Sequence, residues 1–238
     1  EKTFTFEAIS MGGYSHANLI DLQSAKILDD VILESSLGNF SRAELNNKIS
    51  PSFADVKTWV DPFQEGLSGQ AITKYTKELF ELIYLNFTSV NFNEVLLENI
   101  KSRFREEVRN ENLDPNRVFY KKLIHAFYQN HPRRKPQTLE DIDQISLDKV
   151  TNFYKDRFSD ASDFVFTFVG DFKVNEMKPY IEKYLGSLPS INRQESFIDH
   201  KVRIEDQKKN IIVKENSENK STNYRIYNNS FKNNIKNR

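Results

Sequence analysis

Histidine is the residue type in this sequence best suited to bind a transition metal or to act as a general base near neutral pH. There are four, His16, His125, His131 and His200. His125 and His131 are six residues apart, a spacing that places them on different faces of a helix, and His131 precedes a proline. His16 and His200 have no acidic residue at the spacing of a ligand pair. We therefore predict that all four are structural or surface residues.

Carboxylates are a second source of chemistry, because paired acidic side chains can act as general acids and bases. Glu106, Glu107 and Glu111 lie within one predicted helix, and arginines of the same helix are spaced to neutralise them through i,i+4 pairs. This pattern predicts a solvated helix face. The basic run 133–135 lies between two prolines and is predicted to be a solvated loop.

Aromatic residues and glycine motifs offer no further site. Phe53, Trp59 and Phe63 lie in segments predicted to be strands, and we predict that they belong to the core. Gly12 and Gly13 predict a turn. The sequence contains no G-x-S-x-G, no Walker loop and no G-x-G-x-x-G motif. From its residues alone, it supplies no catalytic site.

Composition narrows the class of protein. The 238 residues are 38% hydrophobic and include 19 phenylalanines, enough for a sizeable core in one large or two small domains. A net charge of zero argues against a nucleic-acid-binding surface, and the absence of cysteine rules out disulfides and thiolate metal sites. No segment approaches the ~18 apolar residues of a membrane span. The sequence begins within a strand pattern, without an initiator methionine or signal peptide, so we expect a longer parent protein.

The elements that must position any site form an α+β pattern. Strands are predicted at 2–10, 49–60, 63–72 and 163–169, with the middle two forming a hairpin at Asp61-Pro62. Helices are predicted at 18–33, from Ser41 onward through a capping box, and at 75–87, 93–112, 114–128 and 147–158. This order favours a largely antiparallel sheet with helices packed on one face.

Residues 163–189 form the most regular stretch of the pattern. A phenylalanine alternation predicts a buried strand, in which Phe166 should pack against Ile181 and Tyr184 of the helix that follows. A glycine and a proline end that helix at 186–189. Beyond it, 190–208 is predicted to be a linker, 210–214 and 224–227 short strands, and 228–238 disordered.

Several blocks, in this order, resemble the non-catalytic C-terminal half of insulinase/pitrilysin-type zinc peptidases. They include SMGGYS, GNFSRAEL, ISPSFADVKTWVDPFQEGLSGQA, LDPNRVFYKKL, YQNHPRRKPQTLEDIDQISLDKVTNFYKDRF and the strand–turn–helix block ending in YLGSLP. The resemblance covers about residues 3–189 and is weaker over 200–228. It implies a fold like that of a metalloenzyme or mitochondrial-processing-peptidase domain.

The same resemblance implies that the zinc motif is degenerate. Catalytic members carry H-x-x-E-H on their first long helix, where two histidines bind zinc and the glutamate is the general base, and a later glutamate is the third ligand. The matching segment here is AKILDDVIL, so Lys26 and Asp30 stand at the histidine positions and Asp29 at the base. Only Glu107, at the third ligand, is retained. The resemblance therefore implies no catalytic residue and no zinc in this chain, because a lysine places a cation where the dication would bind.

Family members close two halves around a peptide, and the half without the motif forms part of the chamber wall. The resemblance thus implies a non-catalytic domain at 1–200, and a linker with the truncated start of the next domain at 201–238. Its partners would be a peptide substrate and a zinc-bearing half, in the same protein or in a partner subunit. The periplasm is a location that the resemblance admits. The alternative is a catalytically dead member that serves as a scaffold or assembly subunit.

Overall fold

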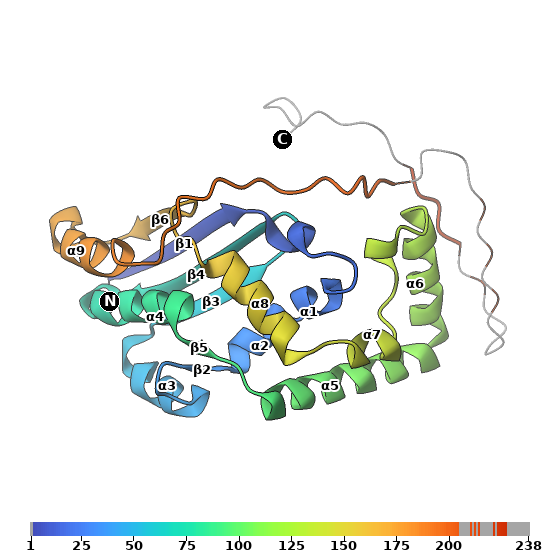
Figure 1. Cartoon of the computed structure of the whole chain (residues 1–238), viewed down its shortest axis with the longest axis horizontal. Helices are drawn as coiled ribbons and strands as arrows, with labels where there is room; N and C mark the ends of the chain where they lie inside the picture. The colour runs from blue at the N-terminus through green and yellow to red at the C-terminus, as the bar shows by residue number, and fades with distance from the viewer. Residues whose placement is uncertain are drawn as a thin grey trace. The chain divides into compact units, whose positions relative to one another are not determined.

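The computed structural model describes residues 2–204, 210, 212, 214, 221 and 223–227. The chain divides into two compact units (Figure 1). The first unit comprises residues 1–105 and 139–199, and the second comprises 106–138 and 200–238. No helix within the described part of the chain is both long enough and apolar enough to span a membrane.

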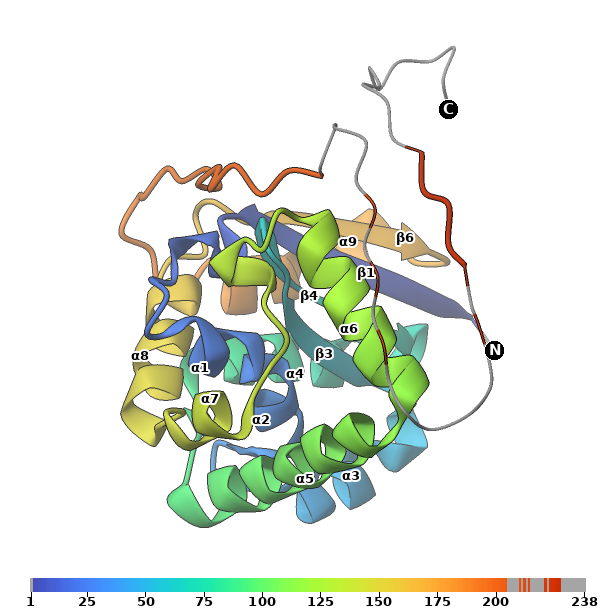
Figure 2. The same cartoon turned by 90° about the vertical axis from the view of Figure 1, so that its right-hand side faces the viewer.

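A four-stranded antiparallel sheet forms the centre of the first unit. Its strands, in spatial order, are β3 (Asp55–Val60), β4 (Gln64–Ile72), β1 (Thr3–Met11) and β6 (Val165–Gly170) (Figure 2). In β1, Phe4, Phe6 and Ala8 are buried, whereas the alternate residues Thr5 and Glu7 are exposed. The buried residues therefore lie on one face of the sheet, and helices cover that face. This arrangement confirms the predicted fold class.

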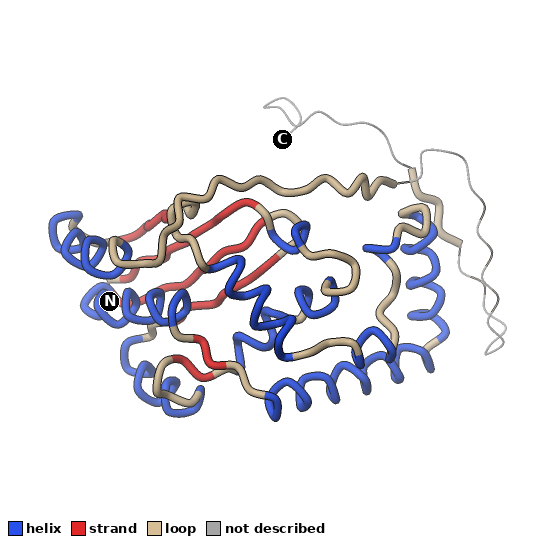
Figure 3. The backbone as a smooth tube through the Cα atoms, in the orientation of Figure 1, coloured by secondary structure: helices blue, strands red, loops and turns tan. Residues whose placement is uncertain are grey.

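Helices cover that buried face (Figure 3). Phe80 on α4 is fully buried and stacks on Phe168 of β6, with the ring centroids 5.3 Å apart. The helices of the first unit are α1 (Leu22–Lys26), α2 (Leu28–Glu34), α3 (Arg42–Ile49), α4 (Thr76–Thr88), α7 (Leu139–Asp143), α8 (Leu147–Phe158) and α9 (Val174–Tyr180), which continues into a π-helical turn at Ile181–Leu185. Two short strands, β2 (Ser36–Leu37) and β5 (Val90–Asn91), pair separately.

Side-chain caps begin the helices where the sequence predicts them. Ser41 and Glu44 form a complete capping box at α3. Asn93 accepts the Leu96 N–H at 2.8 Å before α5 (Glu94–Leu113), and Asp114 accepts the Asn116 N–H at 2.9 Å before α6 (Pro115–Phe127). Ser146 caps α8 in the same way. These predicted helix starts are confirmed.

Three predictions about residues 18–63 are wrong. Residues 18–33 do not form one helix, because α1 and α2 are separate helices that meet at Ile27. The strand predicted from residue 49 begins only at Asp55, because a 3-10 turn at Ser50–Ser52 and a left-handed Phe53 precede it. Phe53 is 69% exposed and Phe63, between β3 and β4, is 47% exposed, so neither belongs to the core. Trp59 lies half-buried in β3.

The strand predicted to be buried lies at the edge of the sheet. Within the described part of the chain, β6 pairs only with β1, and Phe166 is half-buried, with Phe87 and Phe164 as aromatic neighbours at 6.1 and 6.3 Å. The predicted core contact with Ile181 is wrong, because Ile181 is 37% exposed.

The second unit contains the end of α5, all of α6 and part of the C-terminal segment. Phe119 stacks on Tyr224 at 5.6 Å. Glu111 pairs with Arg117 and Lys121 of α6, not with arginines of its own helix as predicted. Arg133 is buried, which corrects the prediction of a fully solvated basic loop. Residues 224–227 form no strand, 210–214 are only partly described, and 228–238 lie outside the described residues.

Candidate functional site

The residues predicted to occupy the degenerate zinc-motif positions 26, 29 and 30 lie on two helices. Lys26 is the last residue of α1, whereas Asp29 and Asp30 lie in the first turn of α2. In H-x-x-E-H, the two histidines must share one face of one helix to bind the same ion. Here Ile27 separates the two positions and has a ψ angle of 2°, outside the helical range.

Asp29, which we predict to stand at the position of the general base, is hydrogen-bonded to the sheet. Its carboxylate accepts the N–H of Val60 at 2.8 Å, at the end of the edge strand β3. Burial raises the pKa of Asp29 from its ordinary 3.8 to about 7, the Val60 N–H opposes this, and the charges of Asp30 and Asp61 add to it. The side chain therefore satisfies a backbone N–H at the end of β3. With a pKa of about 7, its carboxyl is partly protonated near neutral pH.

Carboxylates, which can bind zinc, stand at the remaining two predicted positions, Asp30 and Glu107. Burial raises the pKa of Asp30, while the positive charge of Arg103 acts to lower it. The same arginine binds Glu34 at 2.8 Å, so a cation already neutralises this side of α2. Glu107 belongs to the second unit, and its side chain is exposed. Among the described residues, no three His, Cys, Asp or Glu side chains are placed to hold a metal ion.

Two of the histidines bond to backbone carbonyls. His16 makes a 3.0 Å contact with the Ser196 oxygen in the first unit, and His131 makes a 3.1 Å contact with the His200 oxygen in the second. His125 lies near the end of α6.

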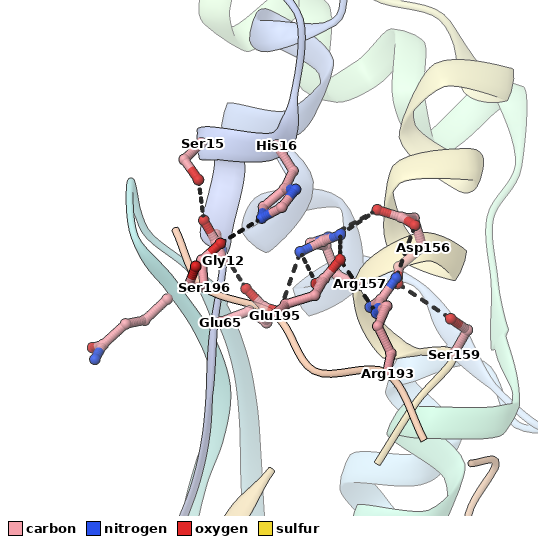
Figure 4. A network of polar contacts seen from close by, with 12 residues as sticks. Gly12, Ser15, His16, Glu65, Asp156, Arg157, Ser159, Arg193, Glu195 and Ser196 are labelled. Atoms are coloured by element: carbon pink, nitrogen blue, oxygen red, sulfur yellow. Dashed lines mark hydrogen bonds and ion pairs between the residues drawn. The ribbon is translucent and has the colours of Figure 1, made fainter. Parts of the chain in front are cut away.

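A buried ion-pair network in the first unit is centred on Arg157 of α8, which is 1% exposed (Figure 4). The guanidinium donates to Asp156 at 2.5 Å and to Glu195 at 2.8 and 3.3 Å. Glu65 of β4 is fully buried, lies 3.6 Å from Arg157 and accepts the Gly13 N–H. A buried charge of this kind is tolerated only when it is paired and hydrogen-bonded.

The local backbone is shaped around this network. Gly12 has a φ of 150°, and a Cβ there would lie 2.5 Å from the Arg157 Nη1. A side chain at this position would therefore displace the guanidinium. Burial raises the pKa of Glu65 to about 7, although the Gly13 N–H and Arg157 both favour its charged form. Burial acts to lower the pKa of Arg157, but its bonds to Asp156 and Glu195 raise it overall.

Sequence reasoning missed this network, although one signal was present. Val150, Phe153, Tyr154 and Phe158 are buried on one face of α8, and Arg157 shares that face. An arginine at an apolar-face position of a helix indicates a buried charge that needs acidic partners.

Comparisons with known proteins find similarity to M16 peptidases and zinc proteases. Residues 144–230 match the family model described as the peptidase M16 inactive domain. The chain is 24% identical over 197 residues to the probable zinc protease PqqL of Haemophilus influenzae, covering 81% of this chain and 21% of that protein.

Solved structures share the fold. The periplasmic protease PqqL from Escherichia coli superposes with a TM-score of 0.72 at 19% identity, over 81% of this chain and 21% of that one. A peptidase M16 inactive domain from Pseudomonas fluorescens gives 0.64 at 16% identity, over 81% and 48%. The chain thus spans about a fifth of the length of both PqqL proteins. The sequence blocks and these matches together support the resemblance of this chain to the inactive domain of insulinase-like M16 peptidases, and the solved structures show that it shares their fold.

Proposed function

We propose that this chain is a non-catalytic domain of an M16-type zinc metallopeptidase and forms part of the wall of its substrate chamber. A zinc-bearing half, in the same polypeptide or in a partner subunit, would hydrolyse the peptide. The observation that supports the proposal is the state of Asp29: the residue that we predict at the position of the base accepts the Val60 N–H.

The residues present do not fit zinc. Lys26 supplies a cation in place of an imidazole, and Asp30 lies in the positive field of Arg103. A catalytic zinc needs three protein ligands. We therefore propose that zinc binds only in the catalytic half, in keeping with the name of the Haemophilus relative as a probable zinc protease.

The extent and location of the domain follow the same proposal. Residues 1–200 form the non-catalytic domain, and 201–238 form a linker with the beginning of a further domain. The chain covers 21% of its Haemophilus relative, which leaves room for a zinc-bearing half in a parent protein of similar length. Because the Escherichia coli relative is described as a periplasmic protease, we propose the periplasm as the location.

The test compares the isolated chain with its full-length parent. We expect the parent to cleave an unfolded peptide and to lose this activity to a chelator, whereas the isolated chain cleaves nothing. Elemental analysis of the untagged chain after dialysis should find far less than one zinc per molecule. In the parent, Glu107→Ala should leave kcat/KM within about twofold, whereas replacement of a histidine in an upstream H-x-x-E-H motif should abolish cleavage.

Two results would overturn the proposal. Stoichiometric zinc in the isolated chain would show that a metal site has been overlooked. A folded Glu107→Ala parent that loses its activity would assign that glutamate to the chemistry. A parent that cleaves no peptide, with or without metal, would support a scaffold role instead.

A further inference from the structure

The segment that follows the last helix of the first unit is docked along its whole length. We name residues 190–199 the strap. It has no helix or strand, and in Figure 3 it is the start of the long tan segment that leads away from α9. Arg193 and Glu195 are half-buried between exposed neighbours, so these two side chains face the domain. The sequence predicted only a linker here.

The first part of the strap is bound by the chain that links α8 to β6. Asp160 is fully buried, and its carboxylate accepts the N–H groups of Ile191 at 3.1 Å and Arg193 at 2.5 Å. The Arg193 guanidinium donates to the side chain of Asp156 at 3.1 Å and to its carbonyl at 2.7 Å. Burial acts to raise the pKa of Asp160. Its hydrogen bonds from Ser162 and from the N–H groups of Arg193 and Ile191 nevertheless hold that pKa well below its usual range.

The second part of the strap is bound by Arg157 and by the turn after β1. The Glu195 carboxylate accepts hydrogen bonds from both terminal nitrogens of Arg157, a two-pronged geometry that is strong and directional (Figure 4). The Ile198 N–H donates to the Ser15 hydroxyl at 2.8 Å, and the Phe197 ring meets Phe63 edge-on at 5.0 Å.

Charge and hydrogen bonding, not apolar burial, hold the strap. Its large apolar residues Ile191, Phe197 and Ile198 are 63%, 43% and 44% exposed. Arg157 would keep Asp156 at 2.5 Å and Glu65 at 3.6 Å if Glu195 moved away. The buried cation therefore stays neutralised when the strap leaves, and the Asp160 carboxylate keeps the Ser162 N–H and hydroxyl as hydrogen-bond donors. A contact with these properties can open without unfolding the domain.

We propose that the strap is an electrostatic latch that sets where the chain leaves the first unit. When the strap is docked, the connector to the following residues begins at residue 200. When it is released, the connector begins at residue 190, and ten more residues can span up to ~33 Å. The latch thereby sets the length of free chain between the first unit and residue 200, whose carbonyl oxygen contacts His131 in the second unit, and this role does not depend on the proposed peptidase function.

Hydrogen exchange on the full chain tests the latch. In the native chain, amides of 191–198 should exchange slowly, and trypsin should spare the bond after Arg193. Glu195→Gln and, separately, Asp160→Asn should speed exchange across the strap and cleavage at Arg193 by at least about tenfold, while β1 amides stay protected. Glu176→Gln is the matched control, because Glu176 pairs with Lys173 on the exposed face of α9, outside the strap.

Three outcomes would overturn the proposal. Unprotected strap amides in the native chain would show that the strap is not docked. Unchanged exchange in both variants would show that these charges do not hold it. Loss of β1 protection together with the strap would make the strap part of the core, not a latch.

Discussion

Asp29 offers the sharpest test of the reasoning, because one substitution separates its two properties. Asparagine keeps an oxygen that can accept the Val60 N–H but cannot carry a charge. In the native chain, Asp29 is a partly buried carboxyl whose pKa is raised from 3.8 to about 7. The Asp29→Asn variant should therefore retain the bond to β3 and lose the unfavourable burial of a negative charge.

Proton linkage gives the direction in which stability changes with pH. A carboxyl whose pKa is higher in the folded than in the unfolded state binds its proton more tightly when folded, so stability falls as pH rises from about 4 to about 7. At 1.36 kcal/mol per pH unit, the difference between 3.8 and 7 amounts to about 4 kcal/mol. Because Asp29 is not fully buried, solvent screens its charge, and we take about half of this, ~2 kcal/mol.

Urea titrations at pH 5 and pH 8 measure the effect. Asp29→Asn should be more stable than the native chain by ~2 kcal/mol at pH 8, and the difference should fall below ~1 kcal/mol at pH 5, because only part of the interval between 3.8 and 7 lies below that pH. Asp171→Asn is the control, since Asp171 makes an exposed pair with Lys2 that should be worth less than ~1 kcal/mol at either pH. If Asp29→Asn is less stable than the native chain at pH 8, Asp29 is a stabilising anion and the argument from burial fails.

Packing supplies two further predictions, both measurable by urea titration. Phe80→Ala removes a fully buried ring that stacks on Phe168 and should lower the free energy of unfolding by ~3–5 kcal/mol. Phe166→Ala on the edge strand should lower it by no more than ~2 kcal/mol. Equal losses would contradict the edge position of β6. Gly66→Ala should cost ~1–3 kcal/mol, because its Cβ would lie 2.4 Å from the Ala8 oxygen and 2.5 Å from the Trp59 ring. A Gly66→Ala midpoint equal to the native one would show that β3 and β4 relax easily.

Local signals explain which parts of the fold could be predicted. A capping box such as Ser41 with Glu44 lies within four residues, so its geometry depends little on the rest of the chain. The β3–β4 hairpin is also local, since Asp61 accepts the N–H groups of Phe63 and Gln64 at its turn. Sequence reasoning found these elements because the interactions that form them are close in sequence.

Sheet order depends on contacts that no local pattern contains. The alternation of phenylalanines in β6 is the same whether the strand is central or at an edge, and only its pairing with β1, more than 150 residues away, decides its place. The same limitation of local patterns explains why the sequence predicts Phe53 and Phe63 to be core residues. Each is adjacent to a strand, but a left-handed turn and a hairpin turn point them to solvent.

The polar network around Arg157 could be predicted only in part. The arginine on the apolar face of α8 is visible in the sequence, but its partners Glu65 and Glu195 lie 92 and 38 residues away along the chain. The degenerate motif positions were found through family resemblance. That resemblance says which residues replace the zinc ligands, and it does not say that Asp29 binds the edge of β3.

Asp29 and Glu65 perform the same task at one end of the sheet. Val60, whose N–H Asp29 accepts, is the register partner of Glu65, and Glu65 in turn accepts the Gly13 N–H from the turn after β1. Two buried carboxyls thus satisfy backbone donors at this end of the sheet. Burial raises the pKa of each to about 7, so both lower the stability of the domain as pH rises toward neutrality. The pH dependence of the native chain therefore combines the two, and only the difference between native and Asp29→Asn chains isolates the contribution of Asp29, the residue predicted at the position of the catalytic base.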